Sequence, residues 1–196
     1  MVEIKRAENK DIPGIVDLHI QNLSRGYLPK LGKPFLVETY KSFLILEPDL
    51  QYTSFVDGKL VGFASGTSDS PTLLRRAIRA NMLGMVSTLI EGIIKNPGNI
   101  ALCFKLILYP GFSKYTDLRP ELLAIAISPS MRGKGIGTML VKQITESFKQ
   151  KDIKSLKLSV WPDLPANQFY KNQGFKFLGS EKFLDGETNF YRLVIS

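Results

Sequence analysis

Hydrophobic positions along the first third of the chain switch between strand-like and helical spacing. Short extended runs of apolar and polar residues alternate with stretches in which apolar side chains recur every three or four positions. An Asp-Ile-Pro sequence opens one such stretch, and an Asp-Gly pair joins two apolar runs, which predicts a hairpin. The expected elements are strands at 2–6, 51–56 and 60–67, a helix that begins at 11–13, and a helix over 34–46.

Residues 70–115 have the most unusual pattern. Apolar residues recur at spacings of three or four from Leu74 to Ile93, which predicts one long amphipathic helix. The basic residues of its first half are Arg75, Arg76 and Arg79. Pro97-Gly98 ends this helix, and a second apolar stretch follows at 100–110. The helix either packs on the rest of the domain, contacts a membrane surface through 73–95, or pairs two copies in a homodimer.

The last third of the chain predicts a strand, a glycine-rich turn and a helix in succession. Residues 121–127 read ELLAIAI, a nearly continuous apolar run typical of a central strand covered on both faces. Another strand at 156–161, a short helix within 165–175 and two final strands around 185–186 complete the pattern. We therefore expect a single α/β domain over residues 1–196, with a mixed, mostly antiparallel sheet flanked by helices. A helical insertion at about 70–115 would lie between the third and fourth strands.

Composition narrows the class of protein. The chain has 196 residues, of which 44% are apolar and 22% are charged, as in ordinary globular domains. Its formal charge of +8 fits an anionic partner or simply solubility. The lone cysteine, Cys103, excludes an internal disulfide, and the lone histidine, His19, argues against a histidine-based metal site. The start does not resemble a signal peptide and no apolar run reaches about 18 residues, so a cytoplasmic location is expected. No bound metal is expected either.

The glycine-rich turn is the most informative chemical feature. Gly133, Gly135 and Gly137 allow the backbone to turn tightly before a helix, whose first N–H groups and positive dipole end favour an anion such as phosphate. Arg132 and Lys134 add positive charge. A Walker A loop would need Lys between the last glycine and the hydroxyl residue, and a Rossmann fingerprint would need a third glycine three positions on, so neither fits.

Two segments resemble motifs of the GNAT superfamily of N-acetyltransferases. The run ISPSMRGKGIGTML at 127–140 resembles motif A, with Arg132, Gly135 and Gly137 in the pattern positions. The run NQFYKNQGF at 167–175 resembles motif B, a short helix that carries Asn and Tyr and ends in Gly-Phe. The resemblance is strong over 121–180, weaker over the chain ends, and does not extend to the insertion. It implies the GNAT fold, with a twisted sheet.

The resemblance also implies a set of cofactor contacts for acetyl-CoA. The backbone around Ile125 and Ile127 would pair with the pantetheine arm, the turn would hold the pyrophosphate, and Asn167 would lie near the thiol end. The residues expected at the cofactor are Ile125, Ala126, Ile127, Arg132, Gly133, Lys134, Gly135, Ile136, Gly137, Thr138, Asn167 and Tyr170.

Catalytic candidates follow from the chemistry of amine acylation. An alkyl ammonium has a pKa of about 10, so a base must remove its proton before it attacks. Glu121 is either that base or a solvated carboxylate at a strand end, and strict alternation would place it on one face with Ile125 and Ile127. Tyr170 is expected to protonate the departing thiolate, the alternative being a core aromatic. A backbone N–H near Ile127 would polarise the thioester.

The sequence thus predicts an N-acetyltransferase that transfers acetyl directly to a primary amine of a small molecule or peptide in a ternary complex. An inactive acyl-CoA-binding regulator is the alternative. A basic nucleic-acid binder would need a recognition motif that the chain lacks, so no nucleic-acid partner is expected. The insertion is predicted to shape the acceptor pocket, its arginines suiting an anionic acceptor such as a nucleotide-linked or lipid-linked sugar. Cys103 as an acyl carrier and His19 as a catalyst are weaker candidates than packing residues.

Overall fold

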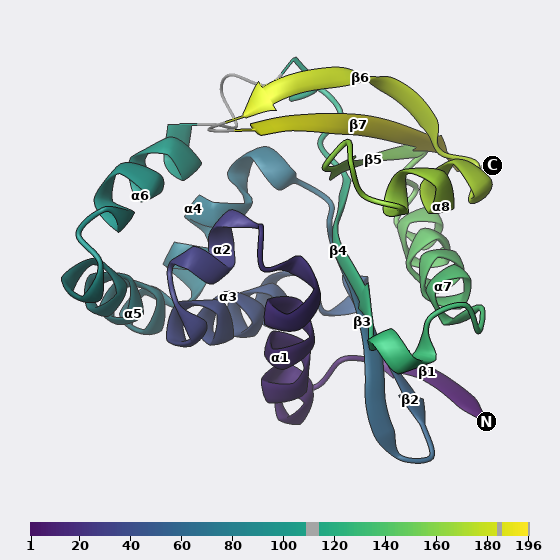
Figure 1. The fold of residues 1–196 in the computed structure, drawn as a ribbon, viewed down its shortest axis with the longest axis horizontal. Coiled ribbons are helices and arrows are strands. Elements are labelled where there is room, and N and C mark those ends of the chain that lie inside the picture. Colours follow the sequence, from purple (N-terminus) through teal and green to yellow (C-terminus); the bar gives the residue numbers. More distant parts are fainter. Residues whose placement is uncertain (109–113, 184–185, 196) are drawn as a thin grey trace.

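The computed structural model describes residues 1–108, 114–183 and 186–195, and it contains one seven-stranded sheet (Figure 1). The strands are β1 (Val2–Arg6), β2 (Gln51–Val56), β3 (Lys59–Thr67), β4 (Glu121–Ile127), β5 (Ser155–Val160), β6 (Lys176–Phe183) and β7 (Gly186–Val194). Their order across the sheet is β1-β2-β3-β4-β5-β7-β6. Only β4 and β5 run parallel, and every other neighbouring pair is antiparallel. The predicted mixed, mostly antiparallel sheet is confirmed.

Helices cover both faces of this sheet (Figure 1). They are α1 (Ile12–Leu23), α2 (Tyr27–Lys30), α3 (Lys33–Leu46), α4 (Ser70–Ala80), α5 (Met82–Lys95), α6 (Asn99–Leu108), α7 (Ile136–Gln150) and α8 (Ala166–Asn172), with 3-10 turns at Asn9–Asp11, Pro48–Leu50 and Pro129–Met131. One apolar cluster joins the sheet to α7 and α8, and a second joins it to α1 and α3. We call these the α7 face and the α1 face.

The long helix predicted over 74–93 is wrong, because the chain breaks at Asn81. There the backbone leaves the helical region (φ −141°, ψ 56°), and α4 and α5 meet at 100°. The Asn81 amide donates to the Glu38 carboxylate of α3 at 2.7 Å. Gly84 lies so close to that carboxylate that a Cβ would come within 2.3 Å of it. Contacts with α3 therefore decide where the insertion bends.

Within the described residues, no single helix is long and apolar enough to cross a bilayer, and only the bent α4–α5 pair passes such a test by length and composition.

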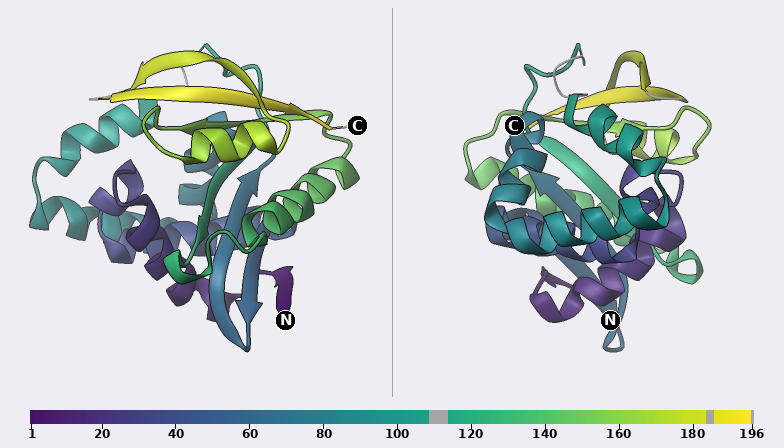
Figure 2. Two further views of the ribbon diagram at one scale, coloured as in Figure 1. Left: turned by 45° about the vertical axis from the view of Figure 1, so that its right-hand side comes forward. Right: turned by 90° about the vertical axis from the view of Figure 1, so that its left-hand side faces the viewer.

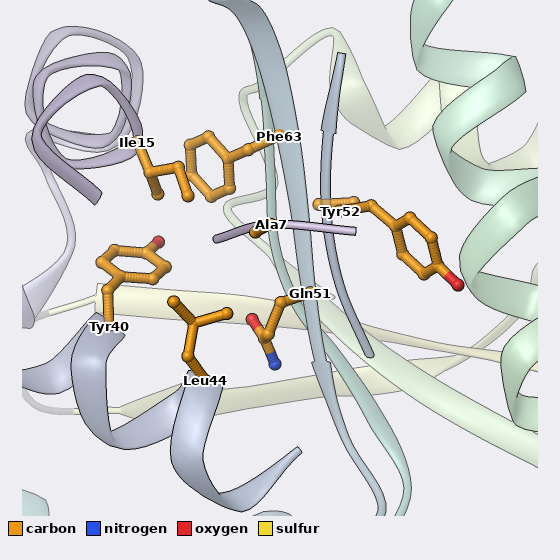
Figure 3. A pocket seen from close by; sticks show the side chains of 8 residues that line it. Ala7, Ile15, Tyr40, Leu44, Gln51, Tyr52 and Phe63 are labelled. Atoms are coloured by element: carbon orange, nitrogen blue, oxygen red, sulfur yellow. The ribbon is translucent and has the colours of Figure 1, made fainter. Parts of the chain in front are cut away.

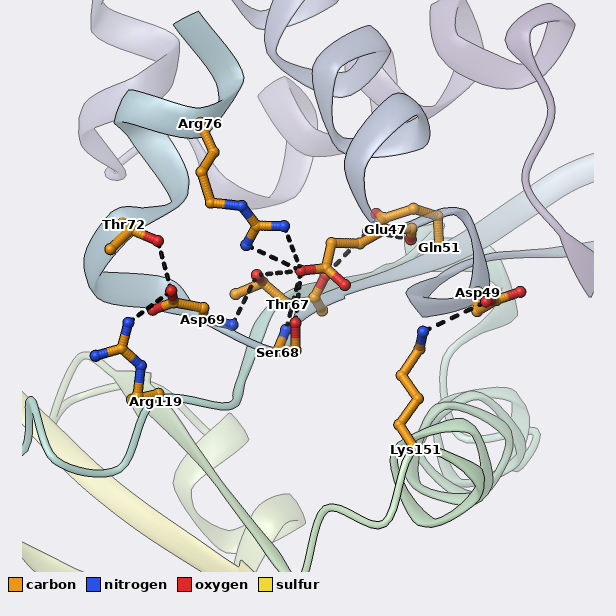
Figure 4. A network of polar contacts seen from close by, with 11 residues as sticks. Glu47, Asp49, Gln51, Thr67, Ser68, Asp69, Thr72, Arg76, Arg119 and Lys151 are labelled. Carbon is orange, nitrogen blue, oxygen red and sulfur yellow. Dashed lines mark hydrogen bonds and ion pairs between the residues drawn. The ribbon is translucent and has the colours of Figure 1, made fainter. Parts of the chain in front are cut away.

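A buried carboxylate attaches α4 to the rest of the domain (Figure 4). Glu47, at the end of α3, is buried, and one of its oxygens accepts from both terminal nitrogens of Arg76 at 3.1 Å. The same oxygen accepts from the Ser68 hydroxyl at 2.7 Å and from Thr67 at 3.3 Å. Nearby, Asp69 accepts from Thr72 and pairs with Arg119. Of the three basic residues at the start of the insertion, Arg76 is thus used internally, whereas Arg75 and Arg79 are exposed.

His19 lies in the core on the α1 face rather than on the helix surface. Its Nδ1 is 2.7 Å from the Tyr40 hydroxyl, and its ring stacks on Phe63. Burial lowers the pKa of His19 to about 4. The adjacent cavity of about 10 Å³, into which Tyr40, Leu44 and Ile15 point, is too small for a substrate (Figure 3). His19 is a packing residue.

The depressed pKa of His19 predicts a loss of stability in acid. Below pH 6.5 the unfolded chain binds a proton that folded His19 rejects until about pH 4, so the free energy of unfolding falls across this window, by up to about 3 kcal/mol. We expect His19→Gln, which cannot take up that proton, to lose correspondingly less stability between pH 7.5 and 4.5 in urea titrations. Equal losses for the two proteins would contradict the prediction.

Candidate active site

The fourth strand is open along half of its length. β4 pairs with β3 from Glu121 to Ile127, but it pairs with β5 only at its first two residues, Glu121 with Lys157 and Leu122 with Leu158. We call this short paired part the vertex. Beyond it the two parallel strands diverge and leave an opening, and α7 and α8 lie beside that opening (Figure 2, left). The second half of β4 therefore has one edge without a strand partner.

Backbone alternation shows which residues use this open edge. The Ser128 N–H donates to the Val61 carbonyl of β3 at 2.7 Å. Because successive residues of a strand direct their N–H and C=O groups to opposite sides, Ala126 also faces β3, whereas Ile125 and Ile127 face the opening. The Ile127 carbonyl accepts from Arg132 Nε at 3.3 Å, in agreement. The backbone of Ala126, expected at the cofactor, is thus engaged with β3.

A bulge in β4 corrects the predicted place of Glu121. Ser65 pairs with Ala124 and Gly66 with Leu122, so Leu123 is an extra residue in the ladder. As a result Leu122, Ile125 and Ile127 pack on the α7 face, whereas Leu123, Ala124 and Ala126 pack on the α1 face. Glu121, next to Leu122, lies on the α1 face, so the predicted common face with Ile125 and Ile127 is wrong.

The glycine-rich turn presents a row of free N–H groups at the carboxyl end of β4. The first N–H bonded within α7 is that of Met139, to the Gly135 carbonyl. Within the described part of the chain, the N–H groups from Gly133 to Thr138 have no backbone acceptor. The N–H of Arg132, which is among the residues expected at the cofactor, donates to the Pro129 carbonyl at 3.4 Å, so the row of free N–H groups begins at Gly133. Such a row at a helix N-terminus can hold a phosphate.

Local geometry explains the three glycines separately. Gly133 and Gly135 have φ values of +75° and +77°, which favour glycine, and a Cβ at either would meet nothing within 4 Å. The backbone there is accessible to a ligand. Gly137 instead allows close packing, because its Cβ would lie 3.3 Å from the Phe169 ring of α8. The turn, α7 and α8 are therefore held together beside the opening.

Tyr170 lies in the cluster on the α7 face. Its ring packs at 5.2 Å from that of Phe169 and 5.6 Å from that of Phe175, centroid to centroid. Burial raises the pKa of its hydroxyl above the ordinary value, so Tyr170 stays protonated across the physiological range. The structure shows Tyr170 as a core aromatic, and its role as the proton donor to the departing thiolate stays a prediction.

Asn167 is occupied within the protein. Its amide nitrogen donates to the carbonyls of Trp161 and Leu164, both at 2.8 Å. Its carbonyl oxygen accepts from Asn189 at 3.0 Å and from the Tyr191 hydroxyl at 2.8 Å. These bonds join the start of α8 to the loop after β5 and to β7. Asn167 thus fixes the start of α8 beside the opening. Its contact with the cofactor stays a prediction.

Glu121 forms a buried ion pair at the vertex of the opening. Its carboxylate lies 3.8 Å from Nζ of Lys157, which also donates to the Tyr115 carbonyl at 2.9 Å. Burial raises the pKa of the Glu121 carboxyl, and Lys157 offsets this only in part. The sequence pattern did not single out Lys157, so only the structure identifies it as the partner of Glu121.

Trp161 was likewise not identified as a site residue. Its ring packs on Gly186, where a Cβ would come within 2.1 Å of it, and lies 6.1 Å from the Tyr27 ring. The Arg25 guanidinium is 5.2 Å from the Trp161 ring and pairs with Asp163 at 2.6 Å. Trp161 therefore joins the α1–α2 connection, the loop after β5 and the start of β7. The one sequence signal that could have drawn attention to Trp161 is that it is the only tryptophan of the chain.

The remaining candidates lie away from this opening. Cys103 packs, partly buried, against the apolar cluster between α3 and the insertion, and burial raises the pKa of its thiol, which disfavours the thiolate that an acyl carrier needs. Among the described residues, no three His, Cys, Asp or Glu side chains converge as metal ligands.

Comparison with known proteins agrees with this geometry. The model of the acetyltransferase (GNAT) family matches residues 18–175. No curated protein sequence matches the chain significantly. Ard1 from Thermoplasma volcanium superposes with a TM-score of 0.64 at 16% identity, covering 100% of this chain and 98% of that one.

Two further solved structures have the same fold. An N-acetyltransferase from Staphylococcus aureus Mu50 has a TM-score of 0.64 at 17% identity, covering 100% of this chain and 99% of that one. A chain of the NatC complex bound to Gag peptide and CoA has a TM-score of 0.65 at 14% identity, with coverage of 100% and 99%. With the family model matching most of the sequence and the opening in β4 in place, the chain belongs to the acetyltransferase (GNAT) family.

Proposed function

We propose that this protein transfers an acetyl group from acetyl-CoA to a primary amine within a ternary complex. The observation that carries the proposal is the open half of β4, which ends beside a row of free N–H groups. A phosphate group fits that row, and an extended amide-containing arm fits the backbone edge at Ile125 and Ile127, which has no strand partner. Acetyl-CoA supplies a thioester, and the chain supplies binding, orientation and proton transfer.

The two proposed catalytic side chains lie on opposite faces of the sheet. Tyr170 belongs to the cluster on the α7 face, whereas Glu121 lies on the α1 face beside the vertex. We assign to Glu121 the removal of a proton from the acceptor ammonium, and to Tyr170 the donation of a proton to the departing thiolate. The nitrogen then bonds to the thioester carbon as the carbon–sulfur bond breaks, and the second proton that the nitrogen loses replaces the one that Tyr170 gave to the thiolate.

The acceptor is proposed only as a primary amine of a small molecule or peptide. Of the three arginines at the start of the insertion, Arg75 and Arg79 are exposed and Arg76 is paired with Glu47, and a contact of these arginines with an anionic acceptor stays a prediction. The reducing cytoplasm remains the predicted compartment. The inactive acyl-CoA-binding regulator differs from the enzyme only in turnover, so measuring turnover distinguishes them.

Release of CoA thiol in the presence of amines tests the proposal, with Tyr170→Phe as the informative variant. We expect amine-dependent release from the wild type and a decrease in kcat of about 10²-fold in Tyr170→Phe, which keeps the ring but loses the proton. Tyr52→Phe is the matched control, because Tyr52 bonds to Ser147 in the same cluster away from the opening. Binding of acetyl-CoA without release for any amine would establish the inactive regulator instead. Activity of Tyr170→Phe within twofold of the wild type would remove Tyr170 from the mechanism.

The pH dependence of kcat tests Glu121. A base must be deprotonated, so kcat should rise with pH through the raised pKa of Glu121, above its ordinary value of 4.5. We expect Glu121→Gln to lose this acid limb and about 10²-fold in kcat. Lys157→Met should move the limb to higher pH, because it removes the cation that lowers the pKa of Glu121. An unchanged limb in Glu121→Gln would mean that a water chain leads to another base; the exposed Glu146→Gln is the control.

A further inference from the structure

α5 is apolar around most of its circumference, which is unusual for a helix at the surface. Met85 and Leu89 on its inner side pack against α3. Its outer side carries a stripe of large aliphatic side chains with high exposed fractions, Met82 60%, Leu83 83%, Val86 39%, Ile90 52% and Ile94 74%. Ile100 at the start of α6 continues the stripe at 46%. A helix that is hydrophobic on all sides is normally buried on all sides.

The outer side of α7 is polar, unlike the aliphatic stripe on α5. The outer side of α7 presents Lys142, Gln143, Glu146 and Lys149, as expected for a helix in contact with water. In the right-hand view of Figure 2, α5 and α6 lie at the front of the molecule, on the side away from the opening in β4. The stripe is therefore separate from the proposed active site.

Charge indicates what covers the stripe. Residues 70–108 contain five basic residues and one acidic residue, a net charge of +4, of which the charge of Arg76 is balanced by the buried Glu47 outside this range. Arg75 and Arg79 on α4 are exposed, and so is Lys95 at the end of α5. The one acidic residue, Glu91, pairs with Lys95 at the edge of the stripe. An apolar stripe on a basic segment is complementary to a surface with anionic headgroups over hydrocarbon.

The same charge disfavours a second copy as the occupant. A symmetric dimer through α5 would place two basic segments against each other, each with the exposed cations Arg75, Arg79 and Lys95. The 100° bend between α4 and α5 also excludes a straight span through the bilayer for this pair. A helix lying in the plane of the surface satisfies both constraints.

We propose that the outer face of α5, together with the start of α6, docks on an anionic lipid bilayer. The five aliphatic side chains of the α5 stripe enter the interface, and Arg75, Arg79 and Lys95 lie at the level of the phosphates. Docking in this way leaves the opening in β4 and its free N–H groups accessible from solvent. The proposal does not depend on acetyl transfer, so the two can fail separately.

Sedimentation with vesicles of phosphatidylcholine containing 30% phosphatidylglycerol tests the proposal on the full chain. We expect the wild type to bind these vesicles and to bind vesicles of phosphatidylcholine alone at least tenfold more weakly. Binding to the anionic vesicles should weaken at high salt. Leu83→Gln/Ile94→Gln should reduce binding at least tenfold. The matched control is Ile45→Gln/Val194→Gln, which changes two side chains of similar exposure, 61% and 63%, outside the stripe. Thermal unfolding checks that each variant is folded.

Three outcomes would overturn the proposal. The wild type could remain in the supernatant with anionic vesicles, or the control variant could lose as much binding as the stripe variant. Light scattering could also show a wild-type dimer that Leu83→Gln/Ile94→Gln converts to a monomer without any vesicle binding, which would make a second copy the occupant.

Discussion

The structure depends on the unequal pairing of β4. This strand is held by β3 from end to end and by β5 over two residues only, so the sheet is continuous at one end of β4 and open at the other. An open strand edge in the middle of a sheet leaves backbone donors and acceptors without partners, which is unfavourable unless water or a ligand satisfies them. Here it is confined to a few residues and lies beside the N-terminus of α7, where free N–H groups also face outward. Both features favour the same kind of extended, phosphate-bearing ligand.

The rest of the fold keeps this opening in shape. The Glu121–Lys157 pair lies at the vertex, Asn167 ties the start of α8 to β7, and Gly137 allows Phe169 to approach α7. Truncating one partner of a buried polar network leaves the other unsatisfied, at a cost of roughly 1–3 kcal/mol, so each contact resists distortion of the walls. The bulge at Leu123 then directs Glu121 to the face opposite Tyr170. The ion pair with Lys157 thus holds Glu121 at the vertex, and the bulge at Leu123 decides which face of the sheet Glu121 occupies.

Much of the fold and part of the site could be predicted from the sequence. The hairpin at Asp57-Gly58, the apolar strand at 121–127 and the glycine turn depend on local chemistry, and each occurs where predicted. Two predictions were wrong, and one of the three arginines at the start of the insertion is engaged internally, for reasons that lie outside the segments themselves. Glu38 of α3 bends the insertion at Asn81, pairing with β3 produces the bulge that turns Glu121, and Glu47 withdraws Arg76 from the surface. In each case a partner distant in sequence decided the outcome.

By itself, then, the sequence determined the succession of strands and helices and the anion-binding character of the turn, because spacing, glycine and helix capping act within a few residues of each other. Tertiary structure alone decided which backbone groups of β4 are free, which face carries Glu121, and that Asn167 is fully hydrogen-bonded. It also separated the insertion into a buried side on α3 and an exposed aliphatic stripe on α5, which one helical pattern could not distinguish. Burial and pairing are properties of neighbours in space, and the folded chain brings those neighbours from segments far apart in sequence.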